Sequence, residues 1–259
     1  MVPKIIGAKQ EYHSNNIHLY QMDCMDLMPQ FPDKWADLSC IDPPYGIGCT
    51  NRLSKGKKGS IHKKFNWNDK GPSREYFDEL YRISKHQIIW GCNYYADKIP
   101  HVGRIVHYKK LTSWSKGKNL SECDLASQSF NNKIEFFEYQ WSGNVQNGKI
   151  NWNNNGDDGR IHPQQKPLAL YKWLLKNYAK PEYKIFDSHL GSASSAIAAY
   201  DFGIAEFVGT EIDLDYFNAA VARFENHKKQ LSLFPAIFDR QKYDKDDINT
   251  GDYQDDLLF

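Results

Sequence analysis

Apolar and polar positions group into short segments that alternate between strand-like and helix-like periodicity. Continuous or alternating apolar runs predict buried strands at 36–42, 87–91, 104–108, 134–141, 183–187 and 206–211. Apolar residues at helical spacing predict helices at 73–84, 192–202 and 214–229. Strands that alternate with helices are typical of a mostly parallel sheet covered by helices on both faces, so we expect an α/β fold.

Two long segments, 46–72 and 108–160, contain few regular patterns. Segments of this length in a compact domain are usually functional loops or disorder. Before Asp69 the first has no acidic residue but six basic ones, namely Arg52, Lys55, Lys57, Lys58, Lys63 and Lys64. We interpret these basic residues as contacts to the phosphates of a nucleic acid, and a solvated loop is the alternative.

Composition and charge divide the chain into two parts. The 259 residues are 41% hydrophobic and carry a formal net charge of +1, which is ordinary for a globular protein. From Asp239 onward, seven aspartates stand against three basic residues. We therefore expect one catalytic domain over 1–229 and an acidic, flexible tail over 230–259.

Several classes of protein are not favoured. The five cysteines are scattered without a Cys-x-x-Cys pair, and no apolar run reaches the length of a membrane helix. The N-terminus lacks the apolar core of a signal peptide. These features predict a soluble protein of a reducing compartment, without a metal and without membrane contact.

The motif Asp42-Pro43-Pro44-Tyr45 directly follows a predicted strand, where open α/β sheets bind their ligands. The exocyclic amino nitrogen of a nucleobase is a weak nucleophile because its lone pair is delocalised into the ring. A carboxylate and a rigidly held proline carbonyl can accept its two N–H bonds, and a tyrosine can stack on a flipped base. The pattern indicates chemistry at such an amino group. A turn that only ends the strand is the alternative.

A glycine turn and an acidic strand end follow later in the chain. The segment 187–194, Asp-Ser-His-Leu-Gly-Ser-Ala-Ser, separates a predicted strand from a helix, and Glu211 follows Gly191 by 20 residues. Glycine allows close approach of the backbone to a ligand, and a carboxylate at this spacing suits ribose hydroxyls. We predict a pocket for a nucleoside-containing cofactor. A structural glycine turn with capping acids is the alternative.

In this order, the motifs resemble those of the beta group of amino-methylating DNA methyltransferases, in which Asp-Pro-Pro-Tyr precedes the glycine motif. Met22-Asp23-Cys24 resembles the opening of that family, and 161–167 resembles its His-Pro-x-Gln-Lys-Pro segment. Residues 211–223 resemble its ribose-binding strand and the helix that follows. The resemblance spans most of the chain.

The resemblance implies a Rossmann-like, SAM-dependent methyltransferase fold with a circularly permuted motif order. The implied sheet has seven strands, one of them a reversed hairpin strand, and the segments 46–72 and 108–160 form a small target-recognition region. SAM as cofactor, no metal, double-stranded DNA as partner and a homodimer are further implications. The implied location is the cytoplasm of a bacterial cell or of a phage-infected host.

The family pattern also assigns residues to two sites. On the target base it places Asp42, Pro43, Pro44 and Tyr45. Around SAM it places Asp23, Cys24, His162, Lys166, Asp187, Gly191, Ser192, Ser194, Glu211 and Asp213. Ala193 stands where the family usually has a second glycine, so we expect a narrower pocket there.

The expected reaction is methylation of adenine N6 in double-stranded DNA by base flipping. Asp42 favours adenine because the N4-cytosine enzymes of the family more often have serine at that position. The alternatives are an N4-cytosine DNA methyltransferase and a non-catalytic module that binds SAM or DNA.

The C-terminal region offers a docking motif. Gln230-Leu-Ser-Leu-Phe234 resembles the short peptide that binds the bacterial sliding clamp, and Gln254 to Phe259 loosely repeats it. The alternative is that 230–234 completes the preceding helix and packs on the domain.

Overall fold

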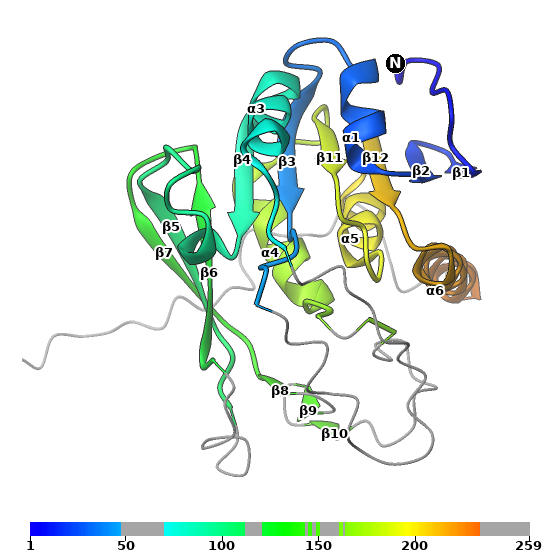
Figure 1. Cartoon of the computed structure of the whole chain (residues 1–259). Helices are drawn as coiled ribbons and strands as arrows, with labels where there is room; N and C mark the ends of the chain where they lie inside the picture. The colour runs from blue at the N-terminus through cyan, green and yellow to red at the C-terminus, as the bar shows by residue number, and fades with distance from the viewer. Residues whose placement is uncertain are drawn as a thin grey trace, which may run out of the picture.

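A computed structural model describes residues 1–47, 70–111, 121–142, 145–146, 149–150, 161–162 and 164–233. Its centre is a sheet of nine strands in the order β1-β2-β12-β11-β3-β4-β6-β5-β7 (Figure 1). The strands are β1 (Gln10–Ser14), β2 (Ile17–Gln21), β3 (Ala36–Ile41), β4 (Ser84–Trp90), β5 (Gly103–Tyr108), β6 (Cys123–Gln128), β7 (Ile134–Glu138), β11 (Lys184–Asp187) and β12 (Glu206–Glu211).

Seven of these strands run in the same direction, and β1 and β6 are reversed. The mostly parallel sheet with a reversed hairpin strand is therefore confirmed. The expected seven strands correspond to the stretch β2-β12-β11-β3-β4-β6-β5 of this sheet. β1 adds an antiparallel edge strand at one side and β7 a parallel one at the other.

Helices cover both faces of the sheet, as predicted (Figure 1). One face carries α4 (Leu168–Tyr178), α5 (Ser194–Phe202) and α6 (Leu214–Leu233). The other carries α1 (Cys24–Leu27), the 3-10 turn η1 (Met28–Gln30) and α3 (Arg74–Ile83). None of the helices in the described ranges is long and apolar enough to cross a membrane.

Strand alternation supplies the two apolar cores. In β4, Ile88 and Trp90 belong to the core under α4 and α5, whereas Ile89 belongs to the core under α3. All three side chains are fully buried, because both faces of a central parallel strand are covered. This burial holds β3 and β4 side by side, and the residues after each strand meet at one edge of the sheet.

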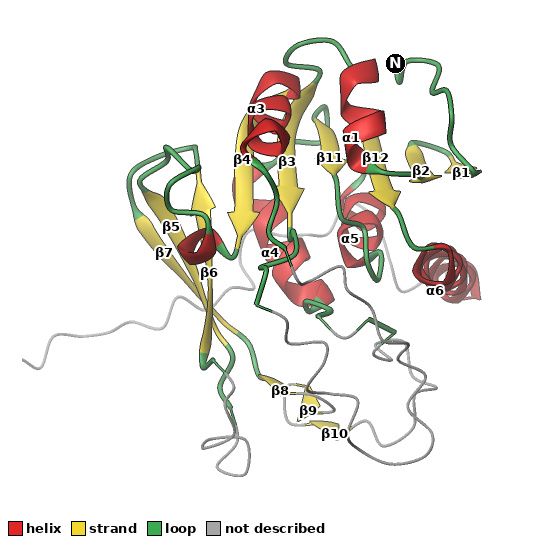
Figure 2. Ribbon diagram, viewed as in Figure 1, coloured by secondary structure: helices red, strands yellow, loops and turns green. Residues whose placement is uncertain are grey.

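The segment 108–160 does not lie wholly outside the sheet. Its described residues include β6 and β7, and three two-residue strands form a separate small sheet (Figure 2). These are β8 (Trp141–Ser142), β9 (Val145–Gln146) and β10 (Lys149–Ile150). The expected recognition insertion is corrected accordingly: residues 123–128 and 134–138 build the central sheet. Burial at only one end of β6 explains why its pattern is weak.

The last described helix extends beyond the predicted domain end at 229. α6 continues to Leu233, so residues 230–233 belong to the helix rather than to the tail. This agrees with the alternative interpretation of the first clamp-like motif. Phe234 and the second motif, 254–259, lie outside the described residues.

Candidate active site

One pocket lies where β3, β11 and β12 end, at the carboxyl edge of the sheet. It joins the two motifs that the sequence analysis treated separately, because Asp42 and Pro44 line it together with Gly191 and Glu211. The other lining residues are His162, Gln164, Gln165, Lys166, Tyr171, His189, Leu190, Ser192, Ser194, Ile212, Asp213 and Tyr216.

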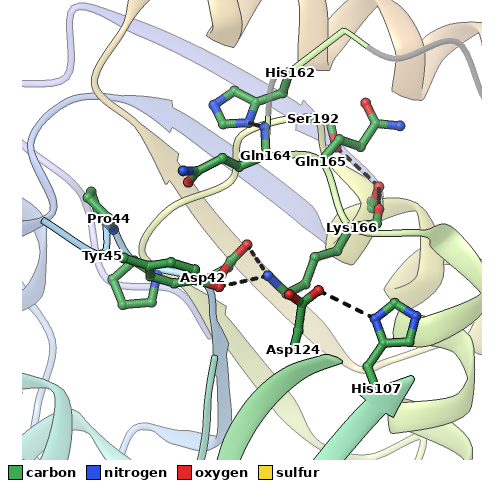
Figure 3. Close-up of polar contacts among 12 residues, drawn as sticks. Asp42, Pro44, Tyr45, His107, Asp124, His162, Gln164, Gln165, Lys166 and Ser192 are labelled. Carbon is green, nitrogen blue, oxygen red and sulfur yellow. Dashed lines mark hydrogen bonds and ion pairs between the residues drawn. The ribbon is translucent and has the colours of Figure 1, made fainter. Parts of the chain in front are cut away.

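Asp42, the first residue after β3, is held by two side chains (Figure 3). Its Oδ1 accepts a 2.7 Å hydrogen bond from the Tyr45 hydroxyl, and its Oδ2 accepts a 2.7 Å bond from Lys166 Nζ. Lys166 Nζ also lies 3.0 Å from the Tyr45 hydroxyl. The three polar groups therefore form a closed triangle at one end of the pocket.

The ring of Tyr45 is fixed by its neighbours. Gly91, directly after β4, has φ +72° and lies against one edge of the ring. Tyr94, in the 3-10 turn η2 (Cys92–Tyr94), stacks on Tyr45 with 5.0 Å between ring centroids and 19° between planes. Burial and the charge of Asp42 raise the pKa of Tyr45 well above its usual value, so its hydroxyl keeps its proton.

The two proline carbonyls face a second tyrosine. Tyr95, almost fully buried, places its hydroxyl 2.5 Å from the Pro44 oxygen and 3.2 Å from the Pro43 oxygen. Proline fixes φ and has no N–H, so the prolines themselves donate no hydrogen bond within the turn. The Tyr95 hydroxyl donates to their carbonyls instead and can hold the turn in one conformation. Tyr95 therefore positions the carbonyls that the sequence analysis assigned to the target base.

Lys166 carries its charge in a nearly dry position. Its side chain is 6% exposed, and the ammonium lies 5.3 Å from the centroid of the Trp90 ring. Asp124, near the start of the reversed strand β6, points its carboxylate toward Lys166 (Figure 3). Burial raises the pKa of Asp124, but contact with His107 and the charges of Lys166 and Lys109 outweigh it and lower the pKa.

The glycine turn after β11 is built on positive φ angles. Gly191 has φ +53°, and its N–H donates to Glu211 Oε2 at 3.0 Å. Ala193 has φ +61°, a value that favours glycine, and its side chain is fully buried in the core rather than in the pocket wall. The expected narrowing of the pocket at Ala193 is thus not observed. At position 193 it is the left-handed φ, rather than the space in the pocket, that favours glycine.

Two acidic residues mark the opposite end of the pocket. Glu211 ends β12, and its Oε1 accepts from the Asp213 N–H at 3.0 Å. Burial raises the pKa of Glu211 to about 7, although the backbone N–H groups of Asp213 and Gly191 oppose this shift. Asp213 Oδ1 accepts from the N–H groups of Asp215 and Tyr216 at the start of α6, so it caps that helix.

The pocket residues fit a nucleoside joined to an amino acid. Glu211 offers acceptors for hydroxyls, and Lys166 offers a positive charge for a carboxylate. Gln165 adds a neutral donor: its Nε2 is buried and has no hydrogen-bond partner within the described part of the chain. The rings of His162 and Tyr216 meet edge to face, 4.6 Å apart, on the wall between these groups.

Three predicted cofactor residues do not line the pocket. Asp23 caps α1 by accepting from the Met25 N–H at 2.8 Å, and Cys24 follows it in that helix. Asp187 is buried beneath the glycine turn, where it accepts from Ser195 Oγ at 2.5 Å and from the His189 N–H at 3.0 Å. Burial raises the pKa of Asp187 to about 6. These contacts make Asp187 a support of the turn rather than a wall of the pocket.

The remaining site predictions divide in two. Seven of the predicted cofactor residues line the pocket, and their assignment to SAM stays a prediction: His162, Lys166, Gly191, Ser192, Ser194, Glu211 and Asp213. The six basic residues from Arg52 to Lys64 lie outside the described residues, so their assignment to DNA stays a prediction. No group of three or more metal-ligating side chains occurs in the described ranges.

Sequence reasoning missed the second layer of the site. The residues that come directly after β4 include Gly91, Tyr94 and Tyr95. Their place at the end of a predicted buried strand was a signal that the sequence offered. Asp124 gave none, because it begins a weakly patterned strand whose reversed direction only the fold reveals.

The sheet order and the helices on both faces are those of the Rossmann-like fold of SAM-dependent methyltransferases. A family model for DNA methylases of the N6/N4 type matches residues 94–222, and the chain belongs to this beta-group family of N6-adenine and N4-cytosine DNA methyltransferases.

Individual relatives agree with this assignment. The type II methyltransferase M.ScaI of Streptomyces caespitosus is 23% identical over 281 residues, covering 89% of this chain and 88% of the relative. M2.MboI of Moraxella bovis is also 23% identical, over 83% of this chain and 89% of its own length. Among solved structures, the cytosine-N4-specific PvuII DNA methyltransferase shares the fold, with a TM-score of 0.56 at 13% identity over 86% of this chain and 94% of the PvuII chain.

Proposed function

We propose that this protein transfers a methyl group from SAM to the N6 amino group of adenine in double-stranded DNA, with the target base flipped out of the duplex. The observation that carries the proposal is the single pocket that joins the Asp42 end to the Gly191 and Glu211 end. A methyl donor and a nucleobase bound in its two halves would meet beside Asp42.

The Asp42 end is suited to activate an amino group. The carboxylate of Asp42 and the carbonyl of Pro43 supply two acceptors, one for each N–H of the amino group. Accepting these bonds concentrates the nitrogen lone pair, which makes the nitrogen a better nucleophile. After transfer the nitrogen must lose one proton, and Asp42 is the acceptor that already faces it.

Tyr45 is suited to hold the base. Its ring is fixed by the bond from its hydroxyl to Asp42 and by the close contact at Gly91. A base must leave the duplex before its amino group can reach a buried carboxylate, and an aromatic ring can replace part of the lost stacking. The ring and the acceptor belong to the same four-residue motif, so one turn sets both.

The opposite end is suited to hold SAM, which supplies an electrophilic methyl group when bound. Glu211 offers its carboxylate to ribose hydroxyls, and the glycine turn at Gly191 gives backbone access. Lys166 and Gln165 offer donors for the amino-acid part. No proton needs to be delivered to the departing thioether, so His162 serves as a wall rather than as an acid.

Methyl transfer to DNA is the direct test. The full chain is incubated with labelled SAM and unmethylated bacterial genomic DNA, and the modified base is identified by mass spectrometry. N6-methyladenine is expected, and Asp42→Ala should abolish transfer while DNA binding persists. N4-methylcytosine would correct the base and keep the mechanism, whereas absence of transfer to any DNA would favour a module that binds without reacting.

A further inference from the structure

Lys166 stands at the boundary between the two halves of the pocket. Its ammonium is bound to Asp42 at 2.7 Å, on the side proposed for the base. Its backbone carbonyl accepts from Ser194 Oγ at 3.2 Å, so its main chain is anchored to the helix start beyond the glycine turn. One residue therefore contacts both motifs.

The ion pair changes what Asp42 can do. Both oxygens of Asp42 already accept a hydrogen bond, one from Tyr45 and one from Lys166, so the carboxylate has less capacity for a further donor than a free one. Both partners are largely removed from water, with side chains 6% and 13% exposed. Pulling Lys166 away leaves two poorly hydrated charges, which is costly unless another anion takes the place of Asp42.

We propose that Lys166 couples the two halves of the pocket: the carboxylate of the amino-acid part of the cofactor competes with Asp42 for this ammonium, so Asp42 becomes a full-strength acceptor for the base only when cofactor is bound. The inference rests on the proposed function and adds a binding order to it. Lys166 is in this view a positioning residue.

Two further groups, besides Asp42 and Tyr45, lie beside the Lys166 ammonium. The centroid of the Trp90 ring lies 5.3 Å from the ammonium. The Asp124 carboxylate faces the ammonium from β6 (Figure 3). Asp124 is held in place by Lys109, whose Nζ lies 3.0 Å from its Oδ1, and His107 Nδ1 lies 3.6 Å from its Oδ2. Asp124 therefore offers a negative charge outside the motif, which lowers the cost of moving Lys166 away from Asp42.

The competition predicts opposite effects of two substitutions on cofactor affinity. S-Adenosylhomocysteine, which has the amino-acid carboxylate, is titrated into the full chain by calorimetry, and methylthioadenosine, which lacks it, is the matched ligand. Asp42→Asn should raise the affinity for S-adenosylhomocysteine by about fivefold or more, because Lys166 is released, and Lys166→Met should lower it by a similar factor. Neither substitution should change the affinity for methylthioadenosine.

The double variant completes the test. In the Lys166→Met background, Asp42→Asn should no longer raise the affinity for S-adenosylhomocysteine, because the effect passes through the ammonium. Lys166→Arg should restore part of the loss. Lys172→Met is the control, since it removes a lysine that pairs with Asp201 at 2.8 Å and does not line the pocket.

Two results would overturn the coupling. One is an unchanged or lower affinity of Asp42→Asn for S-adenosylhomocysteine. The other is an equal gain from Asp42→Asn with and without Lys166. If either result is obtained while the wild-type chain methylates DNA, only the coupling fails. A wild-type chain that binds neither ligand and transfers no methyl group would instead refute the proposed function, and the coupling with it.

Discussion

The ring of Tyr45 passes so close to Gly91 that a Cβ atom on Gly91 would lie 2.3 Å from its Cε1. Gly91 also has φ +72°, where a side chain is strained. The residue after β4 thus sets the position of the ring that follows β3, and two neighbouring parallel strands jointly define the proposed base site.

Gly91→Ala should therefore displace Tyr45. We expect a loss of about 100-fold or more in kcat/KM, equivalent to about 3 kcal/mol of transition-state stabilisation. Cofactor affinity, measured by calorimetry, should change little because Gly91 does not line the pocket. Gly203→Ala is the matched control: this glycine also has positive φ, but no atom lies within 4 Å of the added Cβ. Equal kinetic losses in both variants would contradict a role for the Tyr45 contact.

Tyr95→Phe removes the hydroxyl that faces both proline carbonyls. We expect unfolding free energy to fall by about 1 kcal/mol, as for the loss of one buried hydrogen bond. The turn also loses its restraint, so kcat should fall by about tenfold with the KM for SAM unchanged. Tyr81→Phe provides a comparison, because its hydroxyl bonds to the Lys98 carbonyl away from the pocket. A similar kcat for the two variants would argue against positioning by Tyr95.

Cofactor affinity should depend on the ionisation of Glu211. Burial raises the pKa of this carboxyl to about 7, so it holds a proton over much of the acidic range. Hydroxyl donors favour the ionised form, and binding therefore releases a proton below that pH. Affinity for S-adenosylhomocysteine should rise by up to about tenfold per pH unit until about pH 7 and then level off. Glu211→Gln should lower the affinity and remove this rise, and a persisting rise would assign it to another group.

The same shift has a stability consequence with the opposite sign. The folded ligand-free chain binds the Glu211 proton more tightly than the unfolded chain does, whose carboxyl has a pKa near 4.5. The contribution of Glu211 to the unfolding free energy therefore falls as pH rises from about 4.5 to 7. Denaturant titrations of wild type and Glu211→Gln should diverge across this window. Asp187, whose pKa burial raises to about 6, stays present in both proteins and contributes to both titrations.

Ala193→Gly should cost little stability. The substitution removes a buried methyl group and adds backbone freedom to the unfolded chain, but it also relieves the left-handed conformation at φ +61°. We expect a change within about 1 kcal/mol. Ala199→Gly, at an equally buried site inside α5, lacks this relief and should lose about 2 kcal/mol from helix propensity and burial together. Equal losses at both sites would show that Ala193 is unstrained.

The sequence predicted the part of the fold that depends on strong periodicity. The strands at 36–41 and 206–211 and the helix at 74–83 have clear apolar patterns, and the structure confirms them. The β1–β2 hairpin and β6 were not predicted. β1 is mostly exposed and β6 is buried only at one end, so neither has a full apolar face. Helix α4 was not predicted either, because it is apolar on most of its surface and its two faces differ little in polarity.

The candidate site shows a similar division. Short motifs after strands located Asp42 and Glu211, because the carboxyl ends of parallel strands meet at one edge. The ion pair between Asp42 and Lys166 spans 124 positions and depends on how 164–168 folds back over the pocket, which no local pattern encodes. Asp187 was assigned to the ligand from its motif, whereas its burial and its bond to Ser195 make it part of the scaffold.

The reversed direction of β6 has a consequence for how such enzymes can diversify. Because β6 runs against its neighbours, it brings its first residues, not its last, to the edge where the pocket opens. The last residue of β5, Tyr108, and the first residue of β6, Cys123, are register partners, so both strand ends lie at this edge. Connections at the edge of a sheet tolerate changes in length and sequence better than the strands that they join. The β5–β6 connection can therefore change between related chains while Asp42 and Asp124 keep their places.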